Sequence, residues 1–440
     1  MDSRRSRRIF LFCAALLSFA LLFLVARGVF VRFFLPEAAS ISVTVLEASR
    51  FEPVELLLAQ PTLVALIAWL SPFRSFGALW PSVCAGAGLL LVIALLYPLC
   101  ASSRPFFSLL FFVPAVLSAP FLFMLTADPA SAIAVACLSV AVADMLSHLR
   151  TGHTFPLFSA GLALGLVPFA ASWGLYAVLG AVIVNRLLIE AEEHGFFAEY
   201  IVLFTPFLLG GGGWWFLHWV YRTGGSLFMP LSLPLPEASL FPLTSFVLLV
   251  GAVVTLCAIR CGKDREDCAI AFRFFLLCFT YLGIVWLLLP AAETRLRLAL
   301  LSVGILLLFL AASLLPFRRR IAPFIILLLL CAVTWRELPV YSQNLGRWSD
   351  ALRGEGAISG LYPSEESIGR FLRERLSGVV VGLEGRAPLV EFFARGSVRF
   401  VPPYEQPLPE VLLRTAFSPP SDGEAVLIRS ERWILLQRSR

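Results

Sequence analysis

The chain has 440 residues, of which 59% are hydrophobic and 15% are charged, and its formal net charge is +6. Soluble domains usually carry about 25% charged residues, and the mean hydropathy here is +0.86, so an ordinary soluble protein is excluded. Long apolar runs recur between Ile9 and Trp335, which predicts an α-helical polytopic membrane protein. The arginines gather at the ends of these runs, which suits control of topology and argues against a nucleic-acid partner.

Eleven apolar segments are predicted to cross the membrane. The first, 9–26, follows four arginines that favour a cytoplasmic N-terminus, and we expect it to stay as an uncleaved span rather than to act as a signal peptide. The basic loops between later spans then all fall on the cytoplasmic side, and the odd number places the C-terminus outside. We therefore expect a multi-pass protein of the cytoplasmic (inner) membrane. The other ten spans are expected near 78–99, 106–124, 130–147, 156–171, 174–189, 200–220, 241–259, 273–289, 298–315 and 321–335.

The first external loop, 27–77, carries four glutamates at positions 37, 47, 52 and 55. An enzyme that acts on a lipid-linked donor needs a general base near the headgroups, and a carboxylate can accept a proton from an acceptor hydroxyl. Glu37 is the candidate because it lies closest to the end of the first span. For Glu47, Glu52 and Glu55 the sequence favours solvated loop positions. The apolar piece 60–70 is too short to cross a bilayer and is expected in the interface.

Three further residues are candidates on the same predicted external face. Asp128 lies in the turn "TADPAS", where ordinary turn chemistry before Pro129 is the alternative role. Arg295 and Arg297 lie in the turn before the tenth span, against the positive-inside trend. A guanidinium matches phosphate geometry with two hydrogen bonds, so these arginines could hold a lipid phosphate, with anchoring at the interface as the alternative.

A second polar group lies at the opposite end of the predicted bundle. Asp144, His148 and His153 are residue types that bind metals, but their place at the cytoplasmic end of the fourth span favours a solvated helix end. No pattern in the sequence identifies a metal site, and a requirement for a divalent metal stays open.

Charge density changes near residue 340. Residues 1–340 contain 22 Arg/Lys and 17 Asp/Glu, whereas the last hundred contain 13 and 12, the density of a soluble domain. We predict a membrane domain of residues 1–340 and a soluble extracytoplasmic α/β domain of residues 341–440. The elements expected in the latter are a helix at 364–376 with Ser364 as N-cap, strands at 378–383 and 397–401, a short helix at 387–394 and a hairpin at 424–438.

These features resemble bacterial membrane glycosyltransferases of the protein-mannosyltransferase-like group, within the GT-C class. Members of that group typically follow the first span with Asp-Glu-Ala-x-Ser, then a Pro-Leu-x-Glu-Leu-Leu helix, a Pro-Pro-Leu segment and a Phe-Gly before the second full span. The similar stretches here are "PEAAS" (36–40), "EPVELL" (52–57), "QPTLVALIAWL" (60–70) and "SFGALWPS" (75–82). Later, "SAPFLFMLTADPAS" (118–131) and "ETRLRLALL" (293–301) are similar to the group's acidic turn and its Arg-Tyr turn.

The chain departs from the group's pattern at three points. Pro36 replaces the leading Asp, the acidic turn lacks its Arg and Tyr, and the Arg-Tyr pair is Arg-Leu. By this resemblance Glu37 keeps one acidic position, Asp128 supplies the second, and Arg295 or Arg297 contacts the donor phosphate. The departures leave open whether the site is active.

The resemblance implies transfer of a sugar from a polyprenyl-phosphate donor to a lipid, glycan or protein acceptor on the outer side of the membrane. Two alternatives remain: a non-catalytic GT-C-like scaffold, and a transporter or flippase of lipid-linked glycans. A transporter should carry polar residues near mid-span. Apart from Asn185 and Arg186 few are found, which counts against it.

Overall fold

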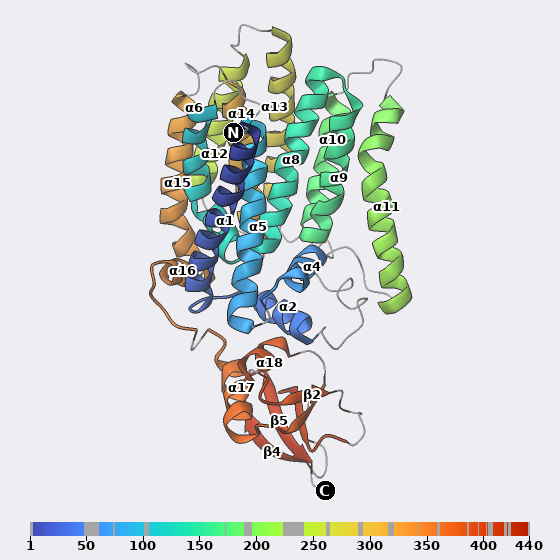
Figure 1. The fold of residues 1–440 in the computed structure, drawn as a ribbon, viewed down its shortest axis with the longest axis vertical. Coiled ribbons are helices and arrows are strands. Elements are labelled where there is room, and N and C mark those ends of the chain that lie inside the picture. Colours follow the sequence, from blue (N-terminus) through green and yellow to red (C-terminus); the bar gives the residue numbers. More distant parts are fainter. Residues whose placement is uncertain are drawn as a thin grey trace.

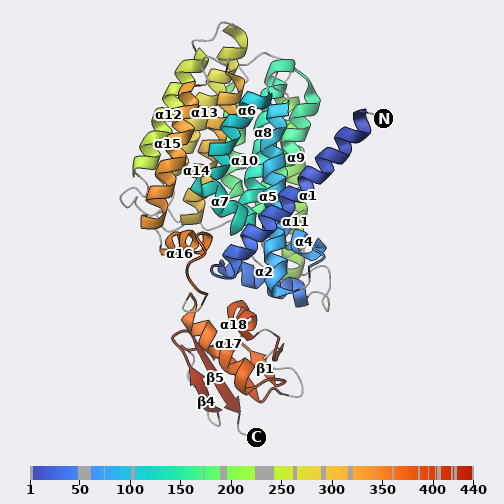
Figure 2. The same cartoon turned by 60° about the vertical axis from the view of Figure 1, so that its left-hand side comes forward.

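The computed structural model describes residues 3–47, 61–73, 75–100, 105–171, 173–188, 196–222, 242–260, 265–288, 294–315, 321–341, 343–358, 361–384, 387–394, 396–401, 403, 408–417, 420 and 424–438. Most of these residues form a bundle of long helices, with a small sheet domain beyond one end (Figures 1 and 2). We call the end next to the sheet the domain-facing end, and the opposite end the far end. The bundle contains α1 (Ser3–Phe30), α5 (Phe76–Cys100), α6 (Pro105–Leu117), α7 (Ala119–Thr126), α8 (Pro129–Thr151), α9 (Thr154–Ala170), α10 (Gly174–Leu188), α11 (Phe196–Arg222), α12 (Pro242–Arg260), α13 (Arg265–Leu288), α14 (Thr294–Leu314) and α15 (Ile321–Tyr341).

The bundle has the character of a membrane domain. In the described part of the chain, four helical stretches are long and apolar enough to cross a membrane: Gly77–Tyr97, Pro129–Thr151, Leu243–Arg260 and Ala269–Trp286. Large apolar side chains point outward, as expected for a surface in lipid; Leu209 of α11, for example, is 72% exposed. All eleven predicted spans overlap helices of the bundle.

The predicted third span, 106–124, is not one continuous helix. It is divided at Ser118 into α6 and α7. Ser118 is extended, with ψ near 145°, and Pro120 lies in the first turn of α7. A proline has no N–H to continue the ladder of α6, but it is well tolerated at the start of a new helix.

The domain-facing end is closed by three short helices, α2 (Pro36–Glu47), α4 (Thr62–Leu70) and α16 (Gln343–Leu352). α4 contains the apolar piece predicted to lie in the interface, and its Trp69 is 41% exposed. α16 follows the predicted boundary at residue 340 but packs on α1 and α15 of the bundle. The assignment of 341–440 to a separate soluble domain stays a prediction.

The C-terminal domain is a five-stranded sheet covered on one face by two helices. The helices are α17 (Pro363–Arg375) and α18 (Pro388–Ala394). The strand order is β2-β1-β3-β5-β4; β1 pairs in parallel with β2 and β3, while β5 is antiparallel to β3 and β4. The predicted strands, short helix and terminal hairpin are confirmed, and the central strand β3 was not predicted. The strands are β1 (Val380–Leu383), β2 (Arg399–Val401), β3 (Val411–Thr415), β4 (Glu424–Arg429) and β5 (Trp433–Arg438).

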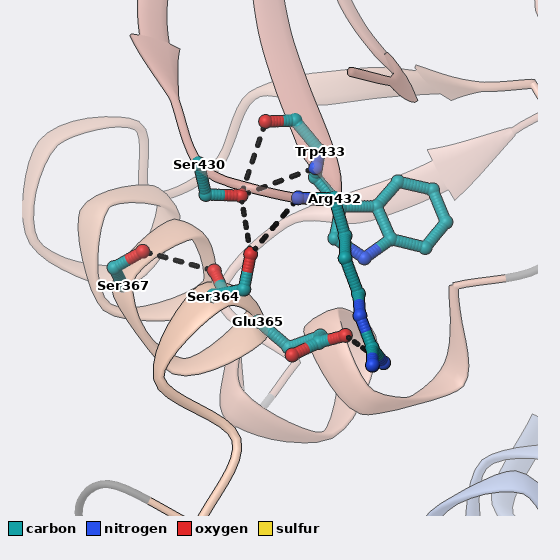
Figure 3. A network of polar contacts seen from close by, with 6 residues as sticks. All are labelled: Ser364, Glu365, Ser367, Ser430, Arg432 and Trp433. Atoms are coloured by element: carbon teal, nitrogen blue, oxygen red, sulfur yellow. Dashed lines mark hydrogen bonds and ion pairs between the residues drawn. The ribbon is translucent and has the colours of Figure 1, made fainter. Parts of the chain in front are cut away.

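The sequence predicted Ser364 as the N-cap of α17, but Tyr362 holds that position. The Ser364 hydroxyl instead donates to Ser430 Oγ over 2.7 Å and accepts from the Arg432 backbone N–H over 3.2 Å (Figure 3). Arg432 also forms an ion pair with Glu365, with Nη1 and Oε1 3.6 Å apart. These contacts join the start of α17 to the β4–β5 turn, so the hairpin is held against the helix that follows the bundle.

Helix α11 is held to the bundle by glycines of α9. A Cβ on Gly161 would lie 2.6 Å from the Leu203 carbonyl oxygen, and one on Gly165 would lie 3.3 Å from the Phe207 nitrogen. The two glycines are four residues apart, the small-xxx-small spacing that lets backbones approach closely within a membrane.

We expect Gly161→Ala to destabilise the α9–α11 pair by about 1–3 kcal/mol, because the added methyl meets backbone atoms that cannot rotate away. Thermal unfolding of the purified protein in detergent measures the change. Gly212→Ala in α11 is the matched control, since nothing lies within 4 Å of a Cβ there. Equal melting temperatures for the two variants would show that the close approach is not required.

Candidate functional site

Three predicted site residues have described side chains, and each is within two residues of a member of one buried hydrophobic cluster at the domain-facing end. Members of this cluster are found two residues before Glu37, directly before Asp128 and directly after Arg297. The cluster therefore brings together the ends of α1, α7 and α14, which are far apart in the sequence. We call it the end cluster; it consists of Val29, Phe33, Leu35, Ala119, Phe123, Ala127, Leu298, Leu345, Trp348 and Ala351.

Glu37 lies in the first turn of α2. Pro36 is the first residue of this helix, a position where its fixed φ fits and its missing N–H costs little. The Glu37 side chain is partly buried. Glu47 ends the same helix, whereas Glu52 and Glu55 lie outside the described residues.

Asp128 is the N-cap of α8 and only 2% exposed. Its Oδ1 accepts the backbone N–H of Ser131 over 3.3 Å, and its Oδ2 accepts the Ser131 hydroxyl over 2.8 Å. Ser131 Oγ in turn accepts the indole N–H of Trp173 over 3.4 Å. The carboxylate is therefore held by two donors from one residue, and that residue is held by a tryptophan at the start of α10.

Arg297 lies in the first turn of α14 and is 6% exposed. Burial of a guanidinium requires partners for its five donors, which suits an anion-binding position near the end of a span. The backbone of Arg295 belongs to the same helical turn, and its side chain lies outside the described residues.

Sequence reasoning missed the contribution of α16 to this end of the bundle. Trp348 is 1% exposed, and its indole N–H donates to Thr126 Oγ1 over 2.9 Å. Its ring stacks on Trp335 with centroids 5.7 Å apart and meets Phe123 edge to face at 5.4 Å. Because Thr126 lies two residues before Asp128, α16 holds the turn that carries the acid. The signal that could have found it is the apolar spacing at 345, 348 and 352.

An apolar cavity of about 90 Å³ lies between α8, α10, α13 and α14. Trp173, Val285 and Leu300 line it near the domain-facing end, and Met145 lines it further into the bundle. Trp173 thus lines the cavity while its indole N–H reaches Ser131, so the cavity wall is two hydrogen bonds from the Asp128 carboxylate.

The polar group at the far end is more buried than the sequence predicted. Asp144 and His148 are 5% and 7% exposed, so the expected solvated helix end is wrong for these two residues. Asp144 accepts the Tyr97 hydroxyl, and His148 Nδ1 lies 2.7 Å from the His153 carbonyl oxygen. His148 Nε2 lies 3.5 Å from Glu199 Oε1. Neighbouring helices cover this end, which explains the difference.

No cluster of three or more His, Cys, Asp or Glu side chains suited to a metal ion is found among the residues that the structure describes.

The sequence matches no protein family and no curated protein. Among solved structures, the chain is similar to ArnT from Cupriavidus metallidurans in the apo state, a GT-C glycosyltransferase, with a TM-score of 0.60. The comparison covers 99% of this chain and 98% of ArnT at 14% sequence identity. The chain therefore has a GT-C-like fold over its whole length, with a small C-terminal sheet domain.

We expect Ser131→Ala to destabilise the protein by about 1.5–3 kcal/mol, because a buried carboxylate loses one donor and the Trp173 indole loses its acceptor. Ser139→Ala is the matched control on the same helix, since its buried hydroxyl donates to the Ala94 carbonyl over 3.1 Å and touches no carboxylate. Unfolding of both variants in detergent measures the difference. A loss no larger than that of Ser139→Ala would mean that Asp128 does not depend on Ser131.

Proposed function

We propose that this protein is a membrane glycosyltransferase of the inner membrane that transfers a sugar from a polyprenyl-phosphate donor to a lipid, glycan or protein acceptor on its outer side. The observation that carries the proposal is the GT-C-like fold, in which the end cluster holds the chain segments next to Glu37, Asp128 and Arg297 at one end of the bundle. Transfer of a sugar from a lipid phosphate needs a proton acceptor and a positive charge near the phosphate. Two acids and a buried arginine at a bundle end can supply these groups.

In the proposed reaction an acceptor hydroxyl oxygen attacks the anomeric carbon of the donor sugar. The bond from that carbon to the phosphate oxygen breaks, and the polyprenyl phosphate leaves with the electron pair. Glu37 accepts the hydroxyl proton as general base, and Asp128 is the assisting acid. Arg297, together with Arg295, stabilises the negative charge of the leaving phosphate.

The apolar cavity supports a lipid-linked donor rather than a soluble one. Its lining is apolar, and Trp173 and Leu300 lie at its domain-facing side. Leu300 is one helical turn beyond Arg297 on α14. A phosphate at Arg297 would therefore leave a short stretch of its isoprenoid chain within reach of this cavity.

A non-catalytic scaffold is the second candidate, and a specific observation favours it. Asp128 is 2% exposed, and its carboxylate caps α8, a structural role that suffices to explain an acid at this position.

The orientation that both candidates assume is a cytoplasmic N-terminus. In Figure 2 α1 runs away from the sheet domain toward its N-terminal end, which supports opposite sides of the membrane for the N-terminus and the C-terminal domain.

We expect Glu37→Gln to lower turnover by about 10²–10⁴, the usual contribution of a general base, with unchanged membrane insertion. Transfer from labelled polyprenyl-phosphate hexose and pentose donors in membranes measures the loss. Glu47→Gln at the other end of α2 controls for helix charge and should keep full transfer. Full transfer by Glu37→Gln would reject this residue as the base. A wild-type protein that transfers nothing, in a strain whose surface glycans survive its deletion, would favour the scaffold.

We expect Arg297→Gln to weaken donor binding by about 1.5–3 kcal/mol, the typical cost of a lost charged hydrogen bond. Arg295→Gln should have a similar effect, and Arg297→Lys a smaller one, because a lysine keeps the charge but not the planar pair of donors. Arg27→Gln is the control, since Arg27 is an exposed arginine in the last turn of α1. Titration with the labelled donor in detergent gives the affinities. Unchanged affinity in both Arg→Gln variants would reduce these residues to interface anchors.

A further inference from the structure

Five aromatic rings join the C-terminal domain to the end of α1. Phe30 and Phe34 come from the first 40 residues, and Phe392 and Phe393 from α18. The centroid of the Phe34 ring lies 4.8 Å from that of Phe392 and 6.2 Å from that of Phe393. The Phe30 ring meets Phe392 edge to face, with centroids 6.1 Å apart. Tyr362, which precedes α17, is the fifth member, with its ring 5.5 Å from Phe34. We call this set the aromatic clasp.

A hydrogen bond also joins the two sides of the clasp. The Tyr362 hydroxyl donates to the Phe34 carbonyl oxygen over 3.1 Å. At the start of α2 the Ala38 N–H donates to the Leu35 carbonyl, the next carbonyl along the chain, over 2.9 Å. Tyr362 thus holds the Phe34 carbonyl from a position 328 residues further along the chain.

The atoms fixed in this way lie directly before the proposed base. Phe34 precedes Glu37 by three residues, and Pro36 between them has a fixed φ. α18 also packs against α2. A displacement of the Phe34 carbonyl would therefore turn the first residues of α2, and with them the Glu37 carboxylate.

We propose that the C-terminal domain is a positioning element of the active site, and that Tyr362 is the positioning residue that acts through Glu37. This proposal rests on the proposed function. General-base catalysis depends on geometry, since a carboxylate must lie within hydrogen-bond reach of the proton that it takes. The domain holds the turn in the one arrangement that the clasp allows.

The test is Tyr362→Phe in the full-length protein, which removes the hydroxyl and keeps the ring. We expect kcat to fall by about three- to tenfold, the effect of one neutral hydrogen bond, while KM for the labelled polyprenyl-phosphate sugar stays constant. Tyr200→Phe is the matched control, because the Tyr200 hydroxyl also donates to a backbone carbonyl, that of Val182, over 3.3 Å near the far end. It should keep wild-type kcat.

A double-mutant cycle separates positioning from a general structural effect. If Tyr362 acts through Glu37, adding Tyr362→Phe to Glu37→Gln should cause no further loss. An equal loss from Tyr362→Phe in both backgrounds, or a change in KM alone, would overturn the proposal.

Hydrogen exchange gives a readout that does not depend on activity. Amides of residues 37–41 should exchange faster in Tyr362→Phe than in wild type or Tyr200→Phe, because the turn before α2 is less restrained. Unchanged exchange would overturn the proposal even if activity fell. A wild-type protein that transfers no sugar would reject the proposed function and any catalytic role of Tyr362, whereas faster exchange would still identify the domain as the support of this turn.

Discussion

The turn between α1 and α2 is the constraint on which the domain-facing end depends. Two consecutive side chains of this turn are buried in different clusters: Phe33 in the end cluster with Trp348, and Phe34 in the aromatic clasp with Phe392. Neither residue can move without opening a buried apolar contact, and large-to-small changes at such positions typically cost about 3–5 kcal/mol. The first span, the bundle end and the C-terminal domain are therefore fixed relative to one another at this turn.

Buried carboxylates at this end serve helix starts that lie in apolar surroundings. Asp128 caps α8, and Glu337 of α15 accepts the backbone N–H groups of Leu243 and Thr244 at the start of α12, over 3.0 and 2.9 Å. Helix N-termini leave N–H groups without intrahelical acceptors, and water is scarce inside a membrane bundle. An acid at a span end therefore already has a structural role as a helix cap, and a catalytic role needs separate evidence. This is why Asp128 is a weaker candidate for a base than Glu37.

The bundle could be predicted because its spans are long apolar runs, a signal that each segment carries by itself. The helix break at Ser118 was not predicted because the apolar character continues across it. Only the prolines on either side of Ser118 indicate the break. The β3 strand is a short apolar run without alternation, so its place between β1 and β5 depends on pairing rather than on pattern. The burial of Asp144 depends on Tyr97, 47 residues away, and no local pattern contains such a contact. The site residues themselves could be proposed from position, but the end cluster that joins their neighbouring segments could not, because its members come from distant parts of the chain.

Pro36 gives α2 a first turn with one acid, Glu37, where the group that the sequence resembles has an Asp-Glu pair. Position 36 is the first residue of α2, where a side-chain carboxylate would be one option and a proline another. The proline gives up a second negative charge and gains a helix start with one fixed dihedral angle. Glu37, in the first turn, then lies near the positive end of the α2 dipole, which stabilises a negative charge there. The Phe34 carbonyl is held by Tyr362 and α2 packs against α18, so the backbone that carries Glu37 is fixed by contacts with the C-terminal domain. In the proposed site Asp128 is buried and caps α8, so the placement of the base depends on this support of α2.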